Sequence, residues 1–130
     1  AQISDLRVVM DLNDAWDKVN STSKIVTGVI VVRKEFADKY PEQLKQFIEE
    51  YKASVEYTST NVDETAQLIA DYGVVASATI AKKALPKCHI VCYTNNDMKD
   101  ALKGFLKVLY DQNPKSVGGS MPEDDFYYEY

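Results

Sequence analysis

The side chains best suited to metal binding or nucleophilic chemistry lie close together at Cys88, His89 and Cys92. Zinc sites combine four ligands, usually in C-x₂₋₄-C and H-x₃₋₅-H pairs, but this chain has one histidine and no second cysteine pair. In a strand, Cys88 and His89 would point to opposite faces, which disfavours a Cys–His dyad. At ~3.3 Å per residue the two cysteines would lie about 13 Å apart, too far for a disulfide. We therefore predict two free thiols, no metal and no cofactor.

Three further groups could bind ions, but their residue patterns favour ordinary turns or a solvated face. Residues 123–125 are all acidic, yet they lack the alternating ligands and the glycine of a calcium loop. Gly118 and Gly119 form a glycine pair with no helix signal directly after it, which indicates a turn rather than a phosphate loop. Lys82, Lys83 and nearby Lys87 are typical of a solvated face. We predict no catalytic residues and a protein that is not an enzyme.

The hydrophobic pattern predicts several helices and few strands. Apolar, β-branched runs predict strands at residues 6–12, 28–33 and 89–93, the second of them central, with Val29, Ile30 and Val31 buried. Apolar steps of three and four predict helices at residues 35–57, 77–84 and 96–112. Asn13 or Asp14 is expected to cap a short helix, and Asn61 and Gly73 to bound another. Two or three strands among many helices predict a helix-rich α/β fold that is only part of a complete sheet. One core is expected to contain Leu44, Phe47, Ile48, Leu102, Phe105, Leu106 and Leu109.

Composition narrows the class of protein further. Apolar residues make up 45% and charged residues 27% of the 130-residue chain, which is typical of a single globular unit. A net charge of −5 argues against nucleic-acid binding. No apolar run reaches the ~20 residues that cross a bilayer, so we expect membrane association only through an anchor outside this chain.

Several tracts resemble one protein family. Four segments are similar in sequence to solute-binding proteins of nitrate/sulfonate/taurine-type ABC importers. These segments are residues 28–36, Tyr40-Pro41-Glu42, residues 84–91 and residues 113–128. The resemblance implies a partial periplasmic-binding-protein type II-like fold. Residues 1–130 would then be a single α/β unit, the C-terminal portion of a two-lobed protein.

The resemblance also implies a function. The chain would belong to an extracytoplasmic bacterial protein, a lipoprotein or a periplasmic one, that delivers a small organic anion or thiamine-precursor-like solute to an importer's membrane subunits. Thr27 is the one ligand-binding residue that it suggests. Without its second lobe the fragment would expose an apolar patch and could form a homodimer. The alternatives are a ligand-sensing module of a larger signalling protein and an enzyme of the related pyrimidine-synthesis branch, which a single histidine disfavours.

Overall fold

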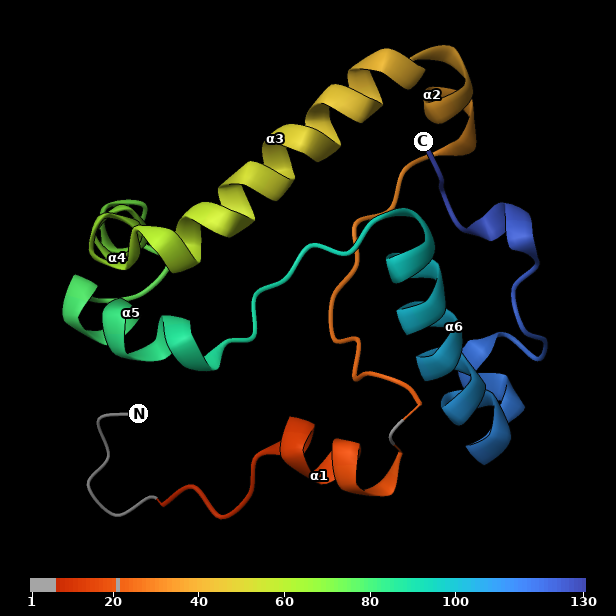
Figure 1. Ribbon diagram of the computed structural model, residues 1–130, viewed down its shortest axis with the longest axis horizontal. Helices are drawn as coiled ribbons and strands as arrows, with labels where there is room; N and C mark the ends of the chain where they lie inside the picture. Colours follow the sequence, from red (N-terminus) through yellow and green to blue (C-terminus); the bar gives the residue numbers. More distant parts are fainter. Residues whose placement is uncertain (1–6, 21) are drawn as a thin grey trace. The chain divides into compact units, whose positions relative to one another are not determined.

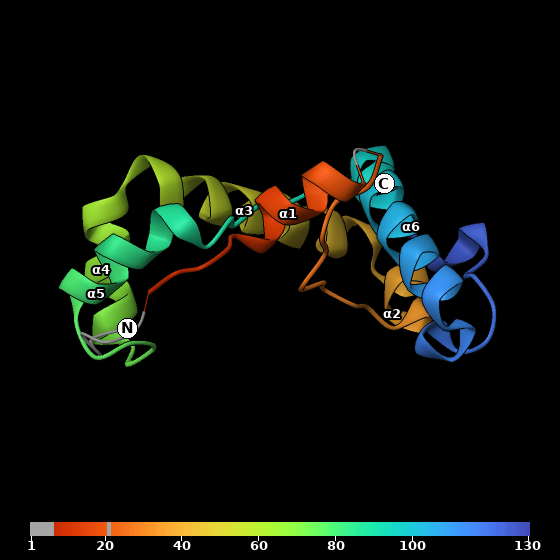
Figure 2. The same cartoon turned by 90° about the horizontal axis from the view of Figure 1, so that it is seen from below.

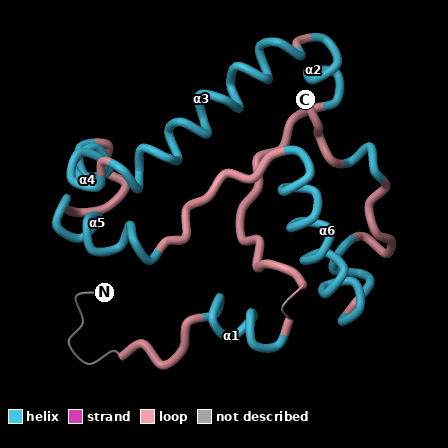
Figure 3. The backbone as a smooth tube through the Cα atoms, in the orientation of Figure 1, coloured by secondary structure: helices cyan, strands magenta, loops and turns pink. Residues whose placement is uncertain are grey.

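The computed structural model describes residues 7–20 and 22–130, and in these ranges every regular element is a helix (Figures 1 and 3). The predicted α/β fold of periplasmic-binding-protein type is therefore wrong: neither range contains a strand. The elements are α1 (Leu12–Val19), α2 (Lys34–Lys39), α3 (Pro41–Thr60), α4 (Val62–Asp71), α5 (Ala78–Ala84) and α6 (Asn95–Gln112), with short 3₁₀ helices η1 (Leu85–Lys87), η2 (Pro114–Val117) and η3 (Asp124–Phe126).

The segments predicted as strands form loops instead. Val29, Ile30 and Val31, predicted to be buried, are 59%, 56% and 81% exposed. A strand is stabilised by hydrogen bonds to a neighbouring strand, and a β-branched run cannot supply that neighbour by itself. The segment at 89–93 also begins with His89 in the left-handed region, at φ 49°, which is incompatible with an extended strand residue. The first predicted strand begins at Leu6, which lies outside the described residues.

Helix boundaries follow local sequence signals closely. Pro41 divides the helix predicted over residues 35–57 and begins α3, because proline suits a first turn and disrupts an interior. Asp11, rather than Asn13 or Asp14, caps α1: its carboxylate accepts hydrogen bonds from the backbone N–H groups of Asn13 at 2.8 Å and Asp14 at 3.3 Å. Ser77 caps α5 in the same way.

Helix α4 ends as its sequence predicts. Gly73 follows the C-cap residue with φ 70°, a conformation that costs glycine little. Its N–H donates to the carbonyl of Ala70 at 2.9 Å, and the N–H of Val74 donates to the carbonyl of Ile69 at 3.0 Å. These two bonds make a Schellman motif, which satisfies carbonyls that the helix end would leave open.

The chain divides into two compact units, of which the first is Ala1–Val31 with Thr94–Glu129. Here Trp16 of α1 packs on Phe105 of α6, with ring centroids 5.6 Å apart. The Trp16 indole N–H donates to Ser23, to the carbonyl oxygen at 3.2 Å and to Oγ at 3.1 Å. Gly104 leaves room for this buried serine, because a Cβ at position 104 would meet the Ser23 Cβ at 3.0 Å.

The second unit is Val32–Tyr93 with Tyr130. Its helices α4 and α5 lie side by side (Figures 1 and 2) and bury Ala66 and Ala81 between them, with Leu85 of η1 beside them. The small alanines permit this close helix approach. Leu44 of α3 is also buried in this unit, at 6% exposure, whereas Phe47 is 47% exposed.

The shared core that we predicted is therefore wrong. Of its seven members only Leu44 is buried, and the α6 residues belong to the first unit. A helical period shows which side chains share a face, but it does not show whether another element covers that face.

Candidate functional site

The residues that the sequence singled out do not converge. Thr27, the predicted ligand-binding residue, is exposed in the loop between α1 and α2, and its role stays a prediction. Cys88 is exposed and its thiol donates to the carbonyl of Ala84 at 3.3 Å, while Cys92 is partly buried and likewise a free thiol. Within residues 7–20 and 22–130 no three His, Cys, Asp or Glu side chains group as metal ligands would.

A hollow in the second unit gathers acid–base groups instead. It has a volume of about 490 Å³ and lies where α3 gives way to α4. We call it the α3–α4 hollow; its lining residues are Thr60, Asn61, Val62, Asp63, Glu64 and Lys82. Helices α3, α4 and α5 thus each contribute to one surface depression.

Tyr57 and Glu64 are hydrogen-bonded beside this hollow. The phenol of Tyr57, in the last turns of α3, donates to the carboxylate of Glu64 in the first turn of α4. This hydrogen bond, first among its causes, raises the pKa of Tyr57 above its usual value near 10. The pair brings a proton donor and a carboxylate base into direct contact, and general acid–base catalysis uses such groups where a substrate lies within hydrogen-bond reach of them.

A second charged pair lines the hollow. Lys82 of α5 forms an ion pair with Asp63 of α4. Both side chains remain largely in water, so the pair adds little stability, but it leaves the ammonium available to a negatively charged ligand. The hollow therefore combines two carboxylates and an amine, and the Tyr57 phenol beside it is hydrogen-bonded to one of these carboxylates.

Sequence reasoning missed these pairs, although one signal pointed to them. Asn61 bounds α4 at its start, as the sequence predicts, but its side chain accepts no hydrogen bond from α4. Asn61 is instead a turn residue, with Tyr57 one helical turn before it and Glu64 in the first turn after it. Two helices meeting at such a turn bring these flanking positions together.

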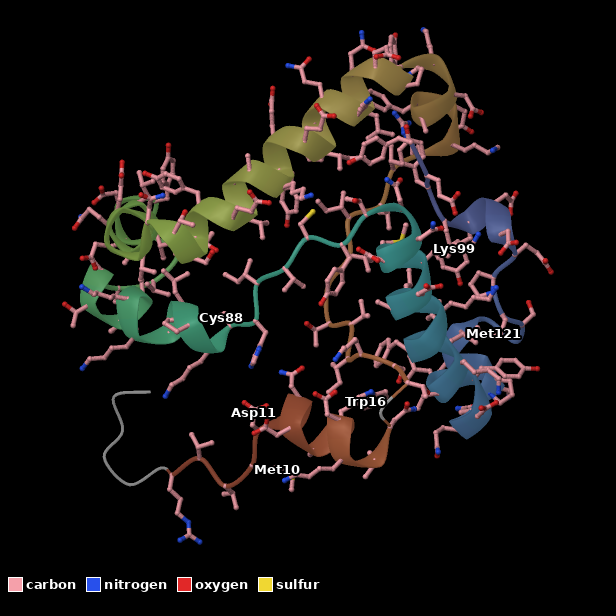
Figure 4. The ribbon with its side chains drawn as sticks, in the orientation of Figure 1. Met10, Asp11, Trp16, Cys88, Lys99 and Met121 are labelled. Carbon is pink, nitrogen blue, oxygen red and sulfur yellow. The ribbon has the colours of Figure 1, made fainter. Side chains whose placement is uncertain are left out.

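The first unit holds another charged cluster, on the face of α6 that Lys99 marks in Figure 4. The ammonium of Lys99 lies 3.2 Å from a carboxylate oxygen of Glu129 and 3.5 Å from one of Asp124. Lys103, one turn further along α6, lies 3.6 Å from the same Asp124 oxygen. The acidic residues 123–125 are thus not merely a solvated turn, because Asp124 is paired with two lysines.

Tyr127 lies against this cluster. It is 5% exposed, and the Lys99 ammonium is 5.9 Å from the centroid of its ring. Its hydroxyl is buried without a hydrogen-bond partner among the described residues. Burial, more than the nearby charge of Asp124, raises the pKa of the Tyr127 phenol. A buried donor left unsatisfied is unfavourable, so this hydroxyl distinguishes the cluster from an ordinary surface ion pair.

The fold and the hollow together define a helical protein of two compact units with acid–base groups on the second. The chain matches the model of a protein family described as menaquinone biosynthesis, over residues 1–110, and it belongs to that family. No curated protein and no solved structure matches it.

Membership in this family corrects the resemblance that the sequence suggested. The chain is not a solute-binding protein of an ABC importer, and it is not a ligand-sensing module of a signalling protein. The partnership with an importer's membrane subunits is wrong for the same reason. Short segments such as residues 28–36 are similar in sequence to the importer proteins. The family match over residues 1–110 carries more weight than several short similarities.

The cellular location of the protein and the place of this chain in a longer protein are still predictions. Along residues 7–20 and 22–130, none of the helices has both the length and the apolar character that a bilayer crossing requires. The extracytoplasmic location stays a prediction. So does the placement of residues 1–130 as a single unit of a longer protein.

Proposed function

We propose that this chain takes part in menaquinone biosynthesis as a catalyst, or as part of one, with Tyr57 and Glu64 as its acid–base pair. The contact between the Tyr57 phenol and the Glu64 carboxylate is the observation that carries the proposal. Both residues lie within the part of the chain that the family model matches. The expectation that the protein is not an enzyme is untested, and a biosynthetic family supports the opposite view.

The roles of the groups follow from their chemistry. Building a quinone ring involves moving protons on and off carbon and oxygen atoms, and a positioned acid or base accelerates such a step by about 10²–10⁴-fold. Glu64 would accept a proton from a carbon of the precursor, and Tyr57 would donate its own proton to an oxygen of the precursor. Protonated Glu64 would then return a proton to the Tyr57 phenolate across their hydrogen bond. Lys82, oriented by Asp63, would hold an acidic precursor beside them.

The proposal can be tested in cells that depend on the full-length gene. Deleting the gene should reduce menaquinone, measured by chromatography and mass spectrometry of extracted lipids. Tyr57→Phe removes only the hydroxyl and should restore less than about a tenth of the wild-type level. Tyr72→Phe is the matched control, because Tyr72 is an exposed tyrosine in the same unit, and it should restore menaquinone fully.

Two results would contradict parts of the proposal separately. Unchanged menaquinone in the deletion strain would exclude the pathway role. Full restoration by Tyr57→Phe, with menaquinone lost in the deletion strain, would retain the pathway role and exclude the Tyr57–Glu64 pair as its acid–base centre.

A further inference from the structure

Lys99 and Lys103 both contact carboxylates that come from one short segment of the chain. This segment, residues 124–129, we call the C-terminal tail; it lies beyond the part matched by the family model. Asp124 is shared between the two ammonium groups at 3.5 and 3.6 Å, and Glu129 approaches Lys99 at 3.2 Å. Two cations one helical turn apart thus already hold carboxylate oxygens.

Lys99 differs from the other lysines of α6 in its surroundings. Its side chain is 23% exposed, against 54% for Lys103 and 58% for Lys107. Tyr127 lies under its ammonium, and the Tyr127 hydroxyl is buried without a partner. The charges of Asp124 and Lys99 both act on this phenol. The cluster therefore offers a partly desolvated cation and an unused hydrogen-bond donor in one place.

We propose that Lys99, Lys103 and Tyr127 form a binding site for a small carboxylate anion, and that Asp124 and Glu129 occupy this site in the structure. A carboxylate has about four lone-pair sites, so one group can accept from two ammonium groups and a phenol together. Neither tail carboxylate does so here, because the Tyr127 hydroxyl stays unpaired. A free carboxylate is not tied to the tail backbone, so it can bridge both ammonium groups. It can also accept from the buried Tyr127 hydroxyl once the tail carboxylates move aside and uncover it.

Displacing the tail carboxylates leaves them in a favourable environment. The side chains of Asp124 and Glu129 are 74% and 49% exposed, so water readily solvates them once Lys99 is released. They remain tethered nearby, however, and compete at a high effective concentration. We therefore expect millimolar affinity in the wild-type protein and tighter binding once this competition is removed.

The test uses benzoate as the probe and benzamide as its uncharged counterpart of the same size. Binding is followed by chemical-shift changes at Lys99 and Tyr127 in the full chain. Benzoate should shift both residues and benzamide neither. The double substitution Asp124→Asn with Glu129→Gln should tighten benzoate binding at least about fivefold, because it removes the intramolecular competitors.

Two lysine substitutions locate the site. Lys99→Met should abolish benzoate binding. Lys107→Met is the control, because Lys107 pairs with Asp111 inside α6 and not with the tail, and it should leave binding unchanged.

Three results would overturn the proposal. The first is equal shifts with benzamide and benzoate. The second is unchanged or weaker benzoate binding in the Asp124→Asn, Glu129→Gln protein, since tail carboxylates that merely support the fold would give that result. The third is undiminished binding in Lys99→Met. The double substitution tests the proposal even if Lys99→Met does not fold, and neither readout depends on menaquinone.

Discussion

Ser23 packs so closely on Gly104 that a side chain at position 104 would require Ser23 to shift by a few tenths of an ångström. A Cβ there would lie 3.0 Å from the Ser23 Cβ and 3.5 Å from its Cα. Neither atom can move away by side-chain rotation, because both are fixed by the backbone. The contact joins the loop after α1 to α6 and keeps Ser23 within reach of the Trp16 indole.

We predict that Gly104→Ala destabilises the protein by about 1 kcal/mol. Overpacking costs about 1–3 kcal/mol, and the better helix propensity of alanine offsets about 1 kcal/mol of that cost. Urea unfolding followed by circular dichroism measures the change. The same substitution in a Ser23→Gly background should stabilise, because the clashing atom is gone. Equal effects in both backgrounds would show that the contact does not limit residue 104.

Two residues of α3 should respond very differently to truncation. Leu44→Ala removes a buried side chain and should cost about 2–3 kcal/mol of unfolding free energy. Phe47→Ala, one turn away, removes a half-exposed ring and should cost below about 1 kcal/mol. Thermal or urea unfolding of both variants makes the comparison. A larger cost at Phe47 than at Leu44 would mean that another surface covers Phe47 in solution.

Gly73→Ala should destabilise α4 by about 1 kcal/mol. Its φ of 70° places it in the left-handed region, where a β-carbon costs about 1–2 kcal/mol. Gly28→Ala is the matched control, because Gly28 has no positive φ and an added Cβ meets nothing within 4 Å. Gly28→Ala should leave the free energy of unfolding unchanged or raise it slightly. Similar losses of stability in the two variants would contradict a specific role for the Schellman motif.

Attachment of the C-terminal tail to α6 should be strongest between about pH 5 and pH 10. Lys99, and then Lys103, lower the pKa of Asp124, so its contribution is present above the unfolded value near 3.9 and is lost as the pH falls through the lowered folded value. The hydrogen bond to Glu129 raises the pKa of Lys99, so its contribution is present below about 10.4 and is lost as the pH rises through the raised folded value.

Protection of the Tyr127 amide against hydrogen exchange, corrected for the intrinsic pH dependence of exchange, measures this attachment. Protection should fall at both ends of the pH range, and added salt should lower it in between because the carboxylates of these pairs are largely exposed. Lys99→Met should lower the protection of the Tyr127 amide between about pH 5 and pH 10. It should also weaken the loss of protection at high pH, because the titrating ammonium is gone. A profile that is independent of both pH and salt would show that burial of Tyr127 alone holds the tail.

The sequence by itself determined the helices and their ends. The proline at 41 and the glycine at 73 act through their own backbones, and the serine at 77 acts through its side-chain hydroxyl. All three effects depend only on neighbours three or four residues away. Such signals survive in any surroundings. The three β-branched runs also have a local preference, but a strand forms only if a second segment supplies hydrogen bonds, and that condition is not local.

Only the tertiary structure decided which side chains meet. The phenol of Tyr57 reaches Glu64 because α3 and α4 turn at Asn61, and Lys82 joins them because α4 packs on α5 through two alanines. Lys99 and Glu129 are thirty positions apart, and no periodic pattern links them. Chain folding brings such distant pairs together through packing that involves many residues at once, so spacing along the sequence could not have located the Lys99 cluster. For Tyr57 and Glu64 the turn at Asn61 was a sequence signal, but only the packing of α3 and α4 decided their contact.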